Sequence, residues 1–504
     1  MNIDMIRSGR GGGPGGRVIQ LVWRKPAGTL AEQTRRRVTI YLLPFLFCLY
    51  ILAYLDRVNI SVAQLGMEKP PSEGGLGFDR ATIGFGAGIF FWGYWILEIP
   101  STVSVVRLGA RWVFARILIL WGLCAALVGL IGTPFVHQLF AWLPTISEHS
   151  AAGDVVDGIL RYPLLAAAAR FVNGLPEDPK YQLYFFRFML GFFEGGFFPS
   201  VIVYLSIWFR GEDRAKAIAS FMSAIPLSLV LGVPVSGLLL GVHWFGLPGW
   251  RWIFLLQGIA PVIAGFVTLF YLPDRPSTAK WMPEEERDWL AAELEREHEA
   301  KARQGHWVWV RHLGAVLLLT AVYFFSNLTS YGLTMFMPAI IRSQSGVTSQ
   351  MASFLAALPY FMGLIVMLVN GWHSDRTGER PWHAALPLAL MSAGIWLTAM
   401  FDGVSVLPVI VIIFGVGTFL FAHLPAFWPM PTMFLGATTA ASAIGFINMI
   451  GNLGGSVGPS VVGNLAEGQT SFAPALRAIA PWPFLAAALI LLAGYTQRKR
   501  RGAP

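Results

Sequence analysis

Residues 38–65 read VTIYLLPFLFCLYILAYLDRVNISVAQL, an apolar run in which only Asp56 and Arg57 are charged. A helix needs about 20 apolar residues to cross the hydrocarbon core of a bilayer, so this run is long enough to span a membrane. A charged side chain at that depth is costly and is seldom retained without a role. Asp56 and Arg57 are therefore candidates for a functional site inside the membrane.

A second apolar run shows the same pattern. Residues 181–209 contain Arg187 and Glu194 and no other charged residue. The two positions lie close to two helical turns apart, so both side chains face the same way, about 10 Å apart along the helix axis. Four charges of both signs at membrane depth predict an anion site with a proton or cation relay.

The composition indicates that the chain is a membrane protein throughout. Of 504 residues, 55% are hydrophobic and 13% are charged, whereas about 25% of the residues in soluble domains are charged. The net charge of +9 does not predict nucleic-acid binding, because the basic residues cluster at the ends of the apolar runs. Both cysteines, Cys48 and Cys124, lie in apolar runs, so a disulfide framework is not expected.

Twelve apolar runs are long enough to cross a bilayer. They are residues 38–65, 79–106, 111–132, 181–209, 213–241, 250–273, 312–340, 347–371, 382–401, 405–435, 438–465 and 474–496. The predicted fold class is an all-α membrane protein with twelve transmembrane helices in two pseudo-symmetric six-helix bundles.

The segments around these runs complete the predicted organisation. They are a disordered cytoplasmic N-terminus at 1–37, an N-terminal bundle at 38–273, a central cytoplasmic loop with an amphipathic helix at 274–311, a C-terminal bundle at 312–497 and a basic cytoplasmic tail at 498–504. An insertion at 133–180 between the third and fourth spans carries scattered prolines. It predicts an outer cap of short helices, with substrate capture as the alternative.

Basic residues predict the orientation, because Lys and Arg are enriched in cytoplasmic loops. They flank the first and last runs and occupy several loops on the same side: Arg35, Arg36, Arg37, Arg107, Arg111, Arg210, Arg214, Lys216, Arg376, Arg380, Arg498, Lys499, Arg500 and Arg501. We therefore expect a multi-pass protein of the cell inner (plasma) membrane with both termini in the cytoplasm.

A loop motif recurs in the two halves. Residues 371–380 read GWHSDRTGER, and residues 106–111 read VRLGAR. Both contain the Arg-x-Gly-x-Arg spacing, but Val106 stands where the second half has Asp375. Internal repeats around a central site are typical of secondary transporters, and this motif would lock helix ends through charge and the helix dipole.

With these features the chain resembles the major facilitator superfamily, and more narrowly its anion:cation symporter family, which carries organic anions such as tartrate, phthalate and sugar acids. The resemblance rests on LDRVN at 55–59, GY at 93–94, EIPS at 98–101, RFMLG at 187–191, EGG at 194–196, LPDRP at 272–276, FW at 427–428, Asn448 and NLGG at 452–455. The long insertion at 133–180 departs from the family pattern.

Helix geometry separates the roles of the adjacent charges. Asp56 and Arg57 point about 100° apart, so they cannot both face one small ligand. We assign Arg57 to the central cavity, because its fork of donors matches a carboxylate, and Asp56, Glu194 and Arg187 to a proton-coupling relay. Arg187 is expected to pair with either carboxylate in turn. The alternative is a static network that holds the first six spans together.

Uncharged residues complete the predicted substrate site. Tyr54 and Tyr94 can each donate a hydroxyl to a carboxylate, although ordinary aromatic packing also explains them. The resemblance implies substrate contact for Trp428, which lies among Pro425, Pro429 and Pro431, and for Asn448. The prolines must interrupt the helix, and broken helices line transporter sites.

Three further positions have open interpretations. Glu98 is a third proton site or, as we favour, supports a helix contact beside Pro100. His423 titrates or, as we favour, is a satisfied core histidine. Sugar-acid members of the family carry an amide near Ile225, so its apolar side chain favours a smaller dicarboxylate or an aromatic acid.

Together these features predict a secondary active transporter that imports a small organic anion with one or more protons by alternating access. An exporter or exchanger on the same fold and a receptor that binds without transport are the alternatives. We expect no enzyme, because no nucleophile motif or phosphate loop is present and His373 and His383 do not make a metal site. The expected partners are the organic anion, a proton or other cation and the lipid bilayer, with no cofactor, no nucleic acid and a monomeric state.

Overall fold

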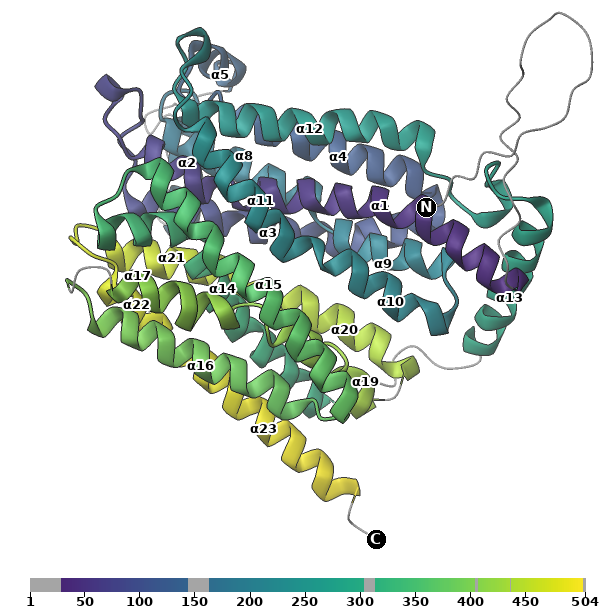
Figure 1. Ribbon diagram of the computed structural model, residues 1–504. Helices are drawn as coiled ribbons and strands as arrows, with labels where there is room; N and C mark the ends of the chain where they lie inside the picture. Colours follow the sequence, from purple (N-terminus) through teal and green to yellow (C-terminus); the bar gives the residue numbers. More distant parts are fainter. Residues whose placement is uncertain (1–28, 144–162, 303–312, 404–406, 436, 502–504) are drawn as a thin grey trace, which may run out of the picture.

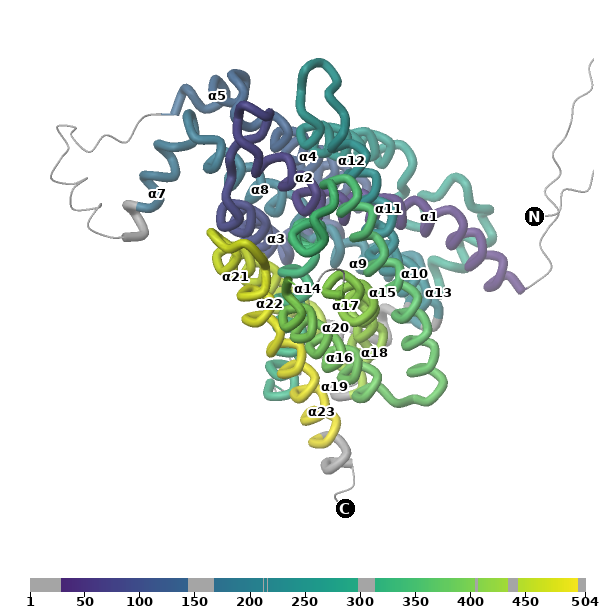
Figure 2. The backbone as a smooth tube through the Cα atoms, turned by 60° about the vertical axis from the view of Figure 1, so that its left-hand side comes forward, coloured from purple at the N-terminus to yellow at the C-terminus, as the bar shows by residue number. Residues whose placement is uncertain are grey.

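The computed structural model describes residues 29–143, 163–302, 313–403, 407–435 and 437–501. Over these ranges every regular element is a helix. Figures 1 and 2 show two groups of long helices, one formed by the first half of the chain and one by the second, packed side by side. Eleven helical segments in this part of the chain are long and apolar enough to cross a membrane.

The first half contributes six membrane passages, three of which are interrupted helices. The long helices are α1 (Leu30–Val58), α2 (Ile60–Met67), α3 (Arg80–Leu108), α4 (Ala110–Val128), α8 (Pro179–Glu194), α9 (Phe197–Trp208), α10 (Gly211–Met222), α11 (Ala224–Leu239) and α12 (Gly249–Tyr271). Three pairs form single passages: α1 with α2, α8 with α9, and α10 with α11. Within the insertion, the described residues form α5 (Pro134–Phe140) and α7 (Pro163–Gly174), and the rest of its predicted cap lies outside the described residues.

The second half has more interruptions. Its helices are α14 (Leu313–Ser345), α15 (Ser349–Thr377), α16 (Pro381–Met400), α17 (Leu407–Val411), α18 (Leu424–Phe427), α19 (Met430–Leu435), α20 (Ala437–Gly451), α21 (Gly454–Ala466), α22 (Ala473–Ile479) and α23 (Pro481–Arg501). Between α17 and α18 the chain forms a π-helical turn, Ile412–Val416, and a 3-10 turn, Gly417–Phe419. The interruption therefore begins well before the prolines that predicted it.

One further passage, the eleventh in chain order, consists of α20 and α21, which are each too short to span a membrane alone. They are separated by Asn452 and Leu453. Asn327 of α14 holds the break, because its side-chain amide donates to the Gly451 carbonyl at 3.2 Å and to Asn452 Oδ1 at 3.3 Å. The described part of the chain therefore has twelve passages in two groups of six, which confirms the predicted fold class.

The first helix begins earlier than the sequence predicted. The prediction of disorder for 1–37 is wrong for Leu30 to Arg37, which form the first turns of α1. Thr29 accepts a hydrogen bond from the Glu32 amide and the Glu32 carboxylate accepts one from the Thr29 amide, so the two residues form a capping box. Residues 1–28 lie outside the described part of the chain.

One end of the bundle, which we call the α13 end, carries the central helix α13 (Glu284–Ala302). Arg37 of α1 makes a two-pronged ion pair with Glu286, at 2.9 and 3.1 Å. Arg214 of α10 donates to Glu297 at 3.0 Å. These contacts attach α13 to the first half. The opposite end, near α5, is called the α5 end.

In both halves a carboxylate contacts an arginine of the loop motif, but only in the second half does that carboxylate belong to the motif itself. In the second half, Arg380 pairs with Asp375 at 2.6 Å within the motif. In the first half, Asp274 from beyond α12 accepts a hydrogen bond from the Arg111 amide at 2.9 Å, at the start of α4. Asp274 therefore supplies the negative charge that Val106 does not, and it lies where the helix dipole favours an anion.

The two halves pack most closely near the α5 end, where α3 crosses α21. A Cβ atom added at Gly84 or Gly88 would collide with the carbonyl oxygens of Pro459 or Ser456. Beyond this crossing, the backbone amides of Arg80 and Ala81 donate to Glu467 at 2.8 and 3.3 Å. The carboxylate of one half thus caps a helix of the other, and the structure is closed on this side.

Candidate substrate site

The candidate site forms where α1 is interrupted. The α-helix stops at Val58, and α2 resumes at Ile60. Arg57 lies in the last turn of α1 and is only 5% exposed. An arginine in this position would be costly to bury without an anionic partner.

Arg57 finds that partner in Glu194, the last residue of α8. Arg57 Nη2 donates to Glu194 Oε1, and both side chains are almost fully buried. The guanidinium also lies over the rings of Tyr54, Phe90 and Tyr94, at 5.1 to 5.2 Å from their centroids. Arg57 Nε and Glu194 Oε2 are buried without a hydrogen-bond partner among the described residues, so this ion pair has unused donor and acceptor capacity.

The second half contacts Arg57 through the hydroxyl of Tyr331. Arg57 Nη1 donates to the Tyr331 hydroxyl of α14 at 3.2 Å. The Tyr54 and Tyr331 hydroxyls also lie 3.2 Å apart. Tyr331 therefore joins the charged pair of the first half to the second half.

Asp56 is separated from this pair. Its carboxylate accepts a hydrogen bond from Trp121 Nε1 of α4 at 2.8 Å and another from Asn59 at 3.3 Å. Asp56 is fully buried within the first half. The structure thus places Arg57 in contact with the other half and Asp56 among residues of the first half.

Arg187 has a different environment from the one expected. Its guanidinium donates to three backbone carbonyls, those of Gly86, Asp56 and Arg57, at 3.2 to 3.3 Å. The expected pairing of Arg187 with a carboxylate side chain is not seen. Glu194 accepts its hydrogen bond from Arg57 instead, and Asp56 accepts one from Trp121. Arg187 instead supports the end of α1, where helix carbonyls lack intrahelical donors.

A small cavity of about 50 Å³ lies between the halves beside this pair. The first half contributes Tyr54 and Ile225, and α14 contributes a polar face that recurs at helical spacing: Tyr323, Ser326, Asn327, Ser330, Tyr331 and Thr334. Trp428 also lines the cavity and contacts Tyr323 edge to face, with ring centroids 5.0 Å apart. Among the predicted substrate residues, Tyr54 and Trp428 therefore face the cavity directly.

Asn448 and Glu98 meet at a second contact between the halves. Asn448 Nδ2 donates to Glu98 Oε1 at 2.6 Å, and both residues are buried. This contact fits the favoured structural interpretation of Glu98. Asn448 is consequently engaged by the first half and does not line the small cavity.

His423 is buried beside the cavity and also has a partner. Its Nε2 atom lies 2.6 Å from Ser326 Oγ, whereas Nδ1 has no hydrogen-bond partner among the described residues. At the α13 end, His373 Nδ1 lies 2.6 Å from His383 Nε2, and His383 Nδ1 lies 2.9 Å from Glu379. No group of three metal-ligating side chains occurs within the described ranges.

Sequence reasoning named Arg57, Tyr54 and Tyr94 for the substrate and Glu194 for the relay, and the structure brings these four residues together. It missed Tyr331, Asn327 and Trp121. The polar face of α14 was visible as a helical repeat between Tyr323 and Thr334. Trp121 carried no signal, because a tryptophan in an apolar run is ordinary and its partner Asp56 lies on another helix.

Comparison with known proteins identifies the family. A family model described as Major Facilitator Superfamily matches residues 158–459. A protein of Agrobacterium vitis named "Putative tartrate transporter" is 36% identical, over 94% of this chain and 97% of that relative. The chain belongs to the major facilitator superfamily. It is therefore a transport protein of this superfamily and not an enzyme.

The chain is also similar to a second relative and, in fold, to a solved structure. A protein of Acinetobacter baumannii named "Quinolone resistance transporter" is 32% identical, over 86% of this chain and 88% of the relative. Among solved structures, a bacterial homologue of the human lysosomal transporter Spinster, in an inward-facing and unoccupied conformation, has a TM-score of 0.66 at 17% identity. It covers 94% of this chain and 99% of the solved chain, and the similarity is one of fold.

Proposed function

We propose that this superfamily member is a secondary transporter that moves a small organic anion together with a proton by alternating access. The observation that carries the proposal is the Arg57–Glu194 pair, buried between the two halves and joined to the second half by Tyr331. Arginine binds carboxylates through paired donors, and a carboxylate beside it can carry the coupled proton.

The pair suggests how binding and protonation are linked. With Glu194 ionised, the guanidinium of Arg57 is neutralised from within the protein. When Glu194 takes up a proton, its attraction for Arg57 falls, and the substrate carboxylate replaces it. Because an unpaired buried charge is strongly unfavourable, Arg57 holds one anion at a time. Release of the proton restores the internal pair and expels the substrate.

The remaining charged groups have supporting roles in this scheme. Asp56 lies next to Arg57 in the chain and is held by Trp121, so it forms a second carboxylate behind the pair. Arg187 fixes the carbonyls at the end of α1 and thereby positions Arg57. Asp56 and Arg187 are proposed to tune the coupling through Arg57 and Glu194 without touching the substrate.

The cavity favours a compact substrate. The wall at Ile225 is apolar, while α14 offers hydroxyl and amide groups opposite it. Tyr54, Tyr94, Trp428 and Asn448 remain the proposed substrate-binding residues beside Arg57, although Asn448 must first leave Glu98. The relative named as a tartrate transporter makes tartrate, a small dicarboxylate, the first substrate to test.

The proposed orientation puts the α13 end in the cytoplasm and the α5 end outside. Basic side chains gather at the α13 end, among them Arg35, Arg37, Arg210 and Arg214, and such enrichment marks the cytoplasmic side. We place the protein in the inner membrane as a monomer. Labelling of single cysteines at either end in intact cells tests the orientation.

An exporter or exchanger is the second candidate, and the similarity to a quinolone resistance transporter favours it. Counterflow from preloaded vesicles distinguishes exchange from net movement. A receptor that binds without transport is the third candidate, and it is excluded if either movement is observed.

The test is uptake of labelled tartrate into proteoliposomes with an imposed pH gradient, acidic outside. The wild-type protein is expected to accumulate tartrate when the gradient is present, and Arg57→Gln is expected to abolish accumulation. Replacing the proton gradient with a sodium gradient identifies the coupling ion. Wild-type uptake that ignores every cation gradient and also survives Arg57→Gln would refute the proposal.

A further inference from the structure

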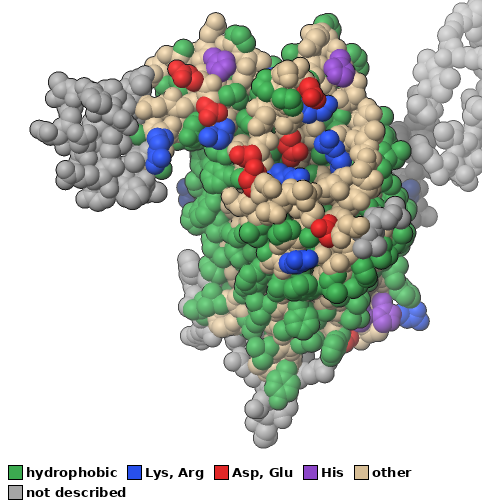
Figure 3. Space-filling view, turned by 90° about the vertical axis from the view of Figure 1, so that its left-hand side faces the viewer, with side chains coloured by type: hydrophobic (Ala, Val, Ile, Leu, Met, Phe, Trp, Pro, Cys, Tyr) green, Lys and Arg blue, Asp and Glu red, His purple; other side chains and the backbone are tan. Residues whose placement is uncertain are grey.

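A larger cavity is separate from the Arg57 site. It measures about 650 Å³ and lies at the α5 end, between the two halves. Its walls come from the end of α2, the connection between α11 and α12, and the connection between α14 and α15. We call it the outer vestibule, following the proposed orientation. Figure 3 shows acidic and basic side chains gathered on the face at this end of the molecule.

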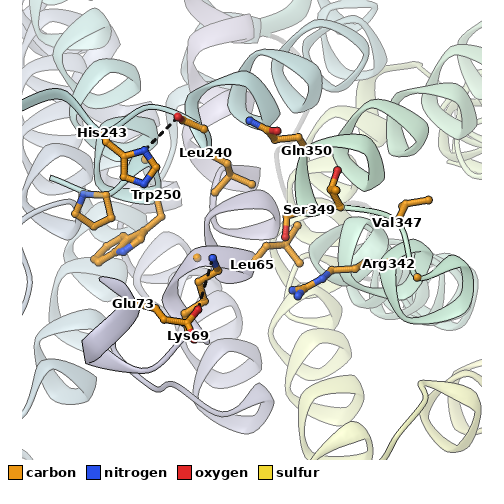
Figure 4. Close-up of a pocket in the computed structure, with 16 residues that line it drawn as sticks. Leu65, Lys69, Glu73, Leu240, His243, Trp250, Arg342, Val347, Ser349 and Gln350 are labelled. Carbon is orange, nitrogen blue, oxygen red and sulfur yellow. Dashed lines mark hydrogen bonds and ion pairs between the residues drawn. The ribbon is translucent and has the colours of Figure 1, made fainter. Parts of the chain in front are cut away.

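Two cationic side chains from opposite halves line the outer vestibule. Figure 4 shows Lys69, from just beyond α2, and Arg342, from the last turn of α14, on two sides of the cavity. Lys69 is partly neutralised by Glu73, whose carboxylate lies 3.8 Å away. His243 is the third basic residue of the wall.

Arg342 differs from the other basic residues of the wall in its environment. It is half-buried, and its guanidinium makes no hydrogen bond or close ion pair with any residue that the structure describes. It interacts electrostatically with Glu68 without direct contact. A half-buried arginine that lines a cavity with its donors unused is suited to bind a carboxylate from solution.

Neutral groups add hydrogen-bonding capacity beside Arg342. Ser349 and Gln350 at the start of α15 face the cavity (Figure 4). Their helix presents its N-terminal end there, which is favourable for a negative charge. Trp250, which also lines the cavity, is held in place: its Nε1 donates to the Gly74 carbonyl at 2.9 Å and its ring packs against Gly66.

We propose that the outer vestibule is a second anion site, in which Arg342 and Lys69 bind a small carboxylate from the outer solution before the halves separate. Its ligand class follows from the proposed function, since the substrate is the carboxylate available to it. The site lies between the two halves at the α5 end, the same end at which α3 and α21 hold the halves together and which must open for entry to Arg57. Occupation here would raise the local substrate concentration when the passage opens.

The first test measures the charge preference of the cavity without assuming any transport. In full-length protein with Cys48→Ala, a Ser349→Cys substitution is reacted from outside with a sulfonate methanethiosulfonate and with its quaternary ammonium counterpart. The ratio of the two rates cancels changes in thiol reactivity. We expect Arg342→Gln to lower the anion-to-cation ratio on the order of threefold to tenfold at low salt. A ratio unchanged by Arg342→Gln and by Lys69→Gln would overturn the proposal.

The second test uses tartrate as the probe. External tartrate is expected to slow the reaction of the anionic reagent with the thiol introduced by Ser349→Cys, and this protection should be lost with Arg342→Gln. It should survive Arg57→Gln, which removes the central site. Absence of protection, or protection that depends on Arg57 and not on Arg342, would overturn the inference. Failure of gradient-driven uptake with protection intact would instead count against the proposed function alone.

Discussion

The two halves of the molecule share a fold but divide the buried charge unequally. The first half buries Asp56, Arg57, Glu98, Arg187 and Glu194 inside the membrane-spanning region. Over its described residues, the second half buries no Asp, Glu, Lys or Arg and offers neutral groups instead, such as Tyr331, Asn327 and His423. The difference suggests that the first half performs the charge chemistry, whereas the second half shapes the site and moves relative to it.

The largest effect is expected from breaking the ion pair of the first half. Arg57→Gln should lower the free energy of unfolding by about 3–5 kcal/mol, because it leaves Glu194 buried without a cation. The double variant Arg57→Gln/Glu194→Gln should recover part of that loss. Thermal or denaturant unfolding in detergent measures both. In the second half, Asn327→Ala should cost less, since it removes only neutral hydrogen bonds. Equal losses at both positions would contradict the division of labour.

The next effect concerns the Tyr331 hydroxyl, through which Arg57 contacts the second half. Tyr331→Phe removes the acceptor for Arg57 Nη1 and should lower the rate of tartrate transport about tenfold, as expected for a hydrogen bond to a charged group. Tyr50→Phe is the matched control, because Tyr50 stacks on Phe198 and Phe221 outside the proposed site and Phe retains that ring. Initial rates at saturating and limiting tartrate compare the two. Similar losses in both variants would mean that the hydroxyl of Tyr331 has no special role.

A smaller effect is expected where the halves pack at the α5 end. Gly88→Ala adds a methyl group against the Ser456 carbonyl and should destabilise the closed arrangement by about 1–3 kcal/mol. Gly445→Ala is the control, because a Cβ atom there meets open space. Accessibility of a cysteine at position 456, introduced as Ser456→Cys, to an external reagent should rise with Gly88→Ala and stay unchanged with Gly445→Ala. Unchanged accessibility in both would show that this crossing does not control closure.

The smallest effect concerns pH at the outer vestibule. Burial raises the pKa of Glu68 to about 7, while Arg80 and Arg342 lower it and Glu467 raises it. Below that pH Glu68 becomes neutral and attracts Arg342 less, so binding of an external anion should strengthen a few-fold as pH falls from about 8 to about 6. Glu68→Gln should give the low-pH behaviour at both values. Tartrate protection of the thiol introduced by Ser349→Cys measures it, with His243→Gln as the control for the histidine in the wall.

Sequence reasoning identified the charged residues of the site, but it did not identify the partners with which they form hydrogen bonds and ion pairs. Charges in apolar runs identified Asp56, Arg57, Arg187 and Glu194, because such residues are conspicuous at membrane depth. It could not determine that Arg57 pairs with Glu194 while Arg187 supports backbone carbonyls, since the outcome depends on how α1, α4 and α8 are placed. The capping box of Thr29 and Glu32 was readable, yet the first helix was predicted to begin at 38 because the apolar run begins there.

The fold could be predicted from the sequence more completely than the site, for a related reason. Twelve apolar runs suffice to predict two six-helix groups, even where a passage such as α20 and α21 is broken. The break itself is stabilised by Asn327 from a distant helix, which no local pattern shows. Likewise, Asp274 replaces the carboxylate missing from the first loop motif, although it lies 163 positions beyond Arg111 in the chain.

The most direct test of the central claim is a comparison of two transport modes in Glu194→Gln. Glutamine imitates the protonated carboxylate and cannot release a proton. If Glu194 carries the coupled proton, the variant should retain tartrate counterflow in preloaded vesicles within a few-fold of wild type and should lose accumulation driven by a pH gradient. Accumulation that persists at the wild-type level would contradict the account, because Glu194 could then not be the group that links protonation to binding at Arg57.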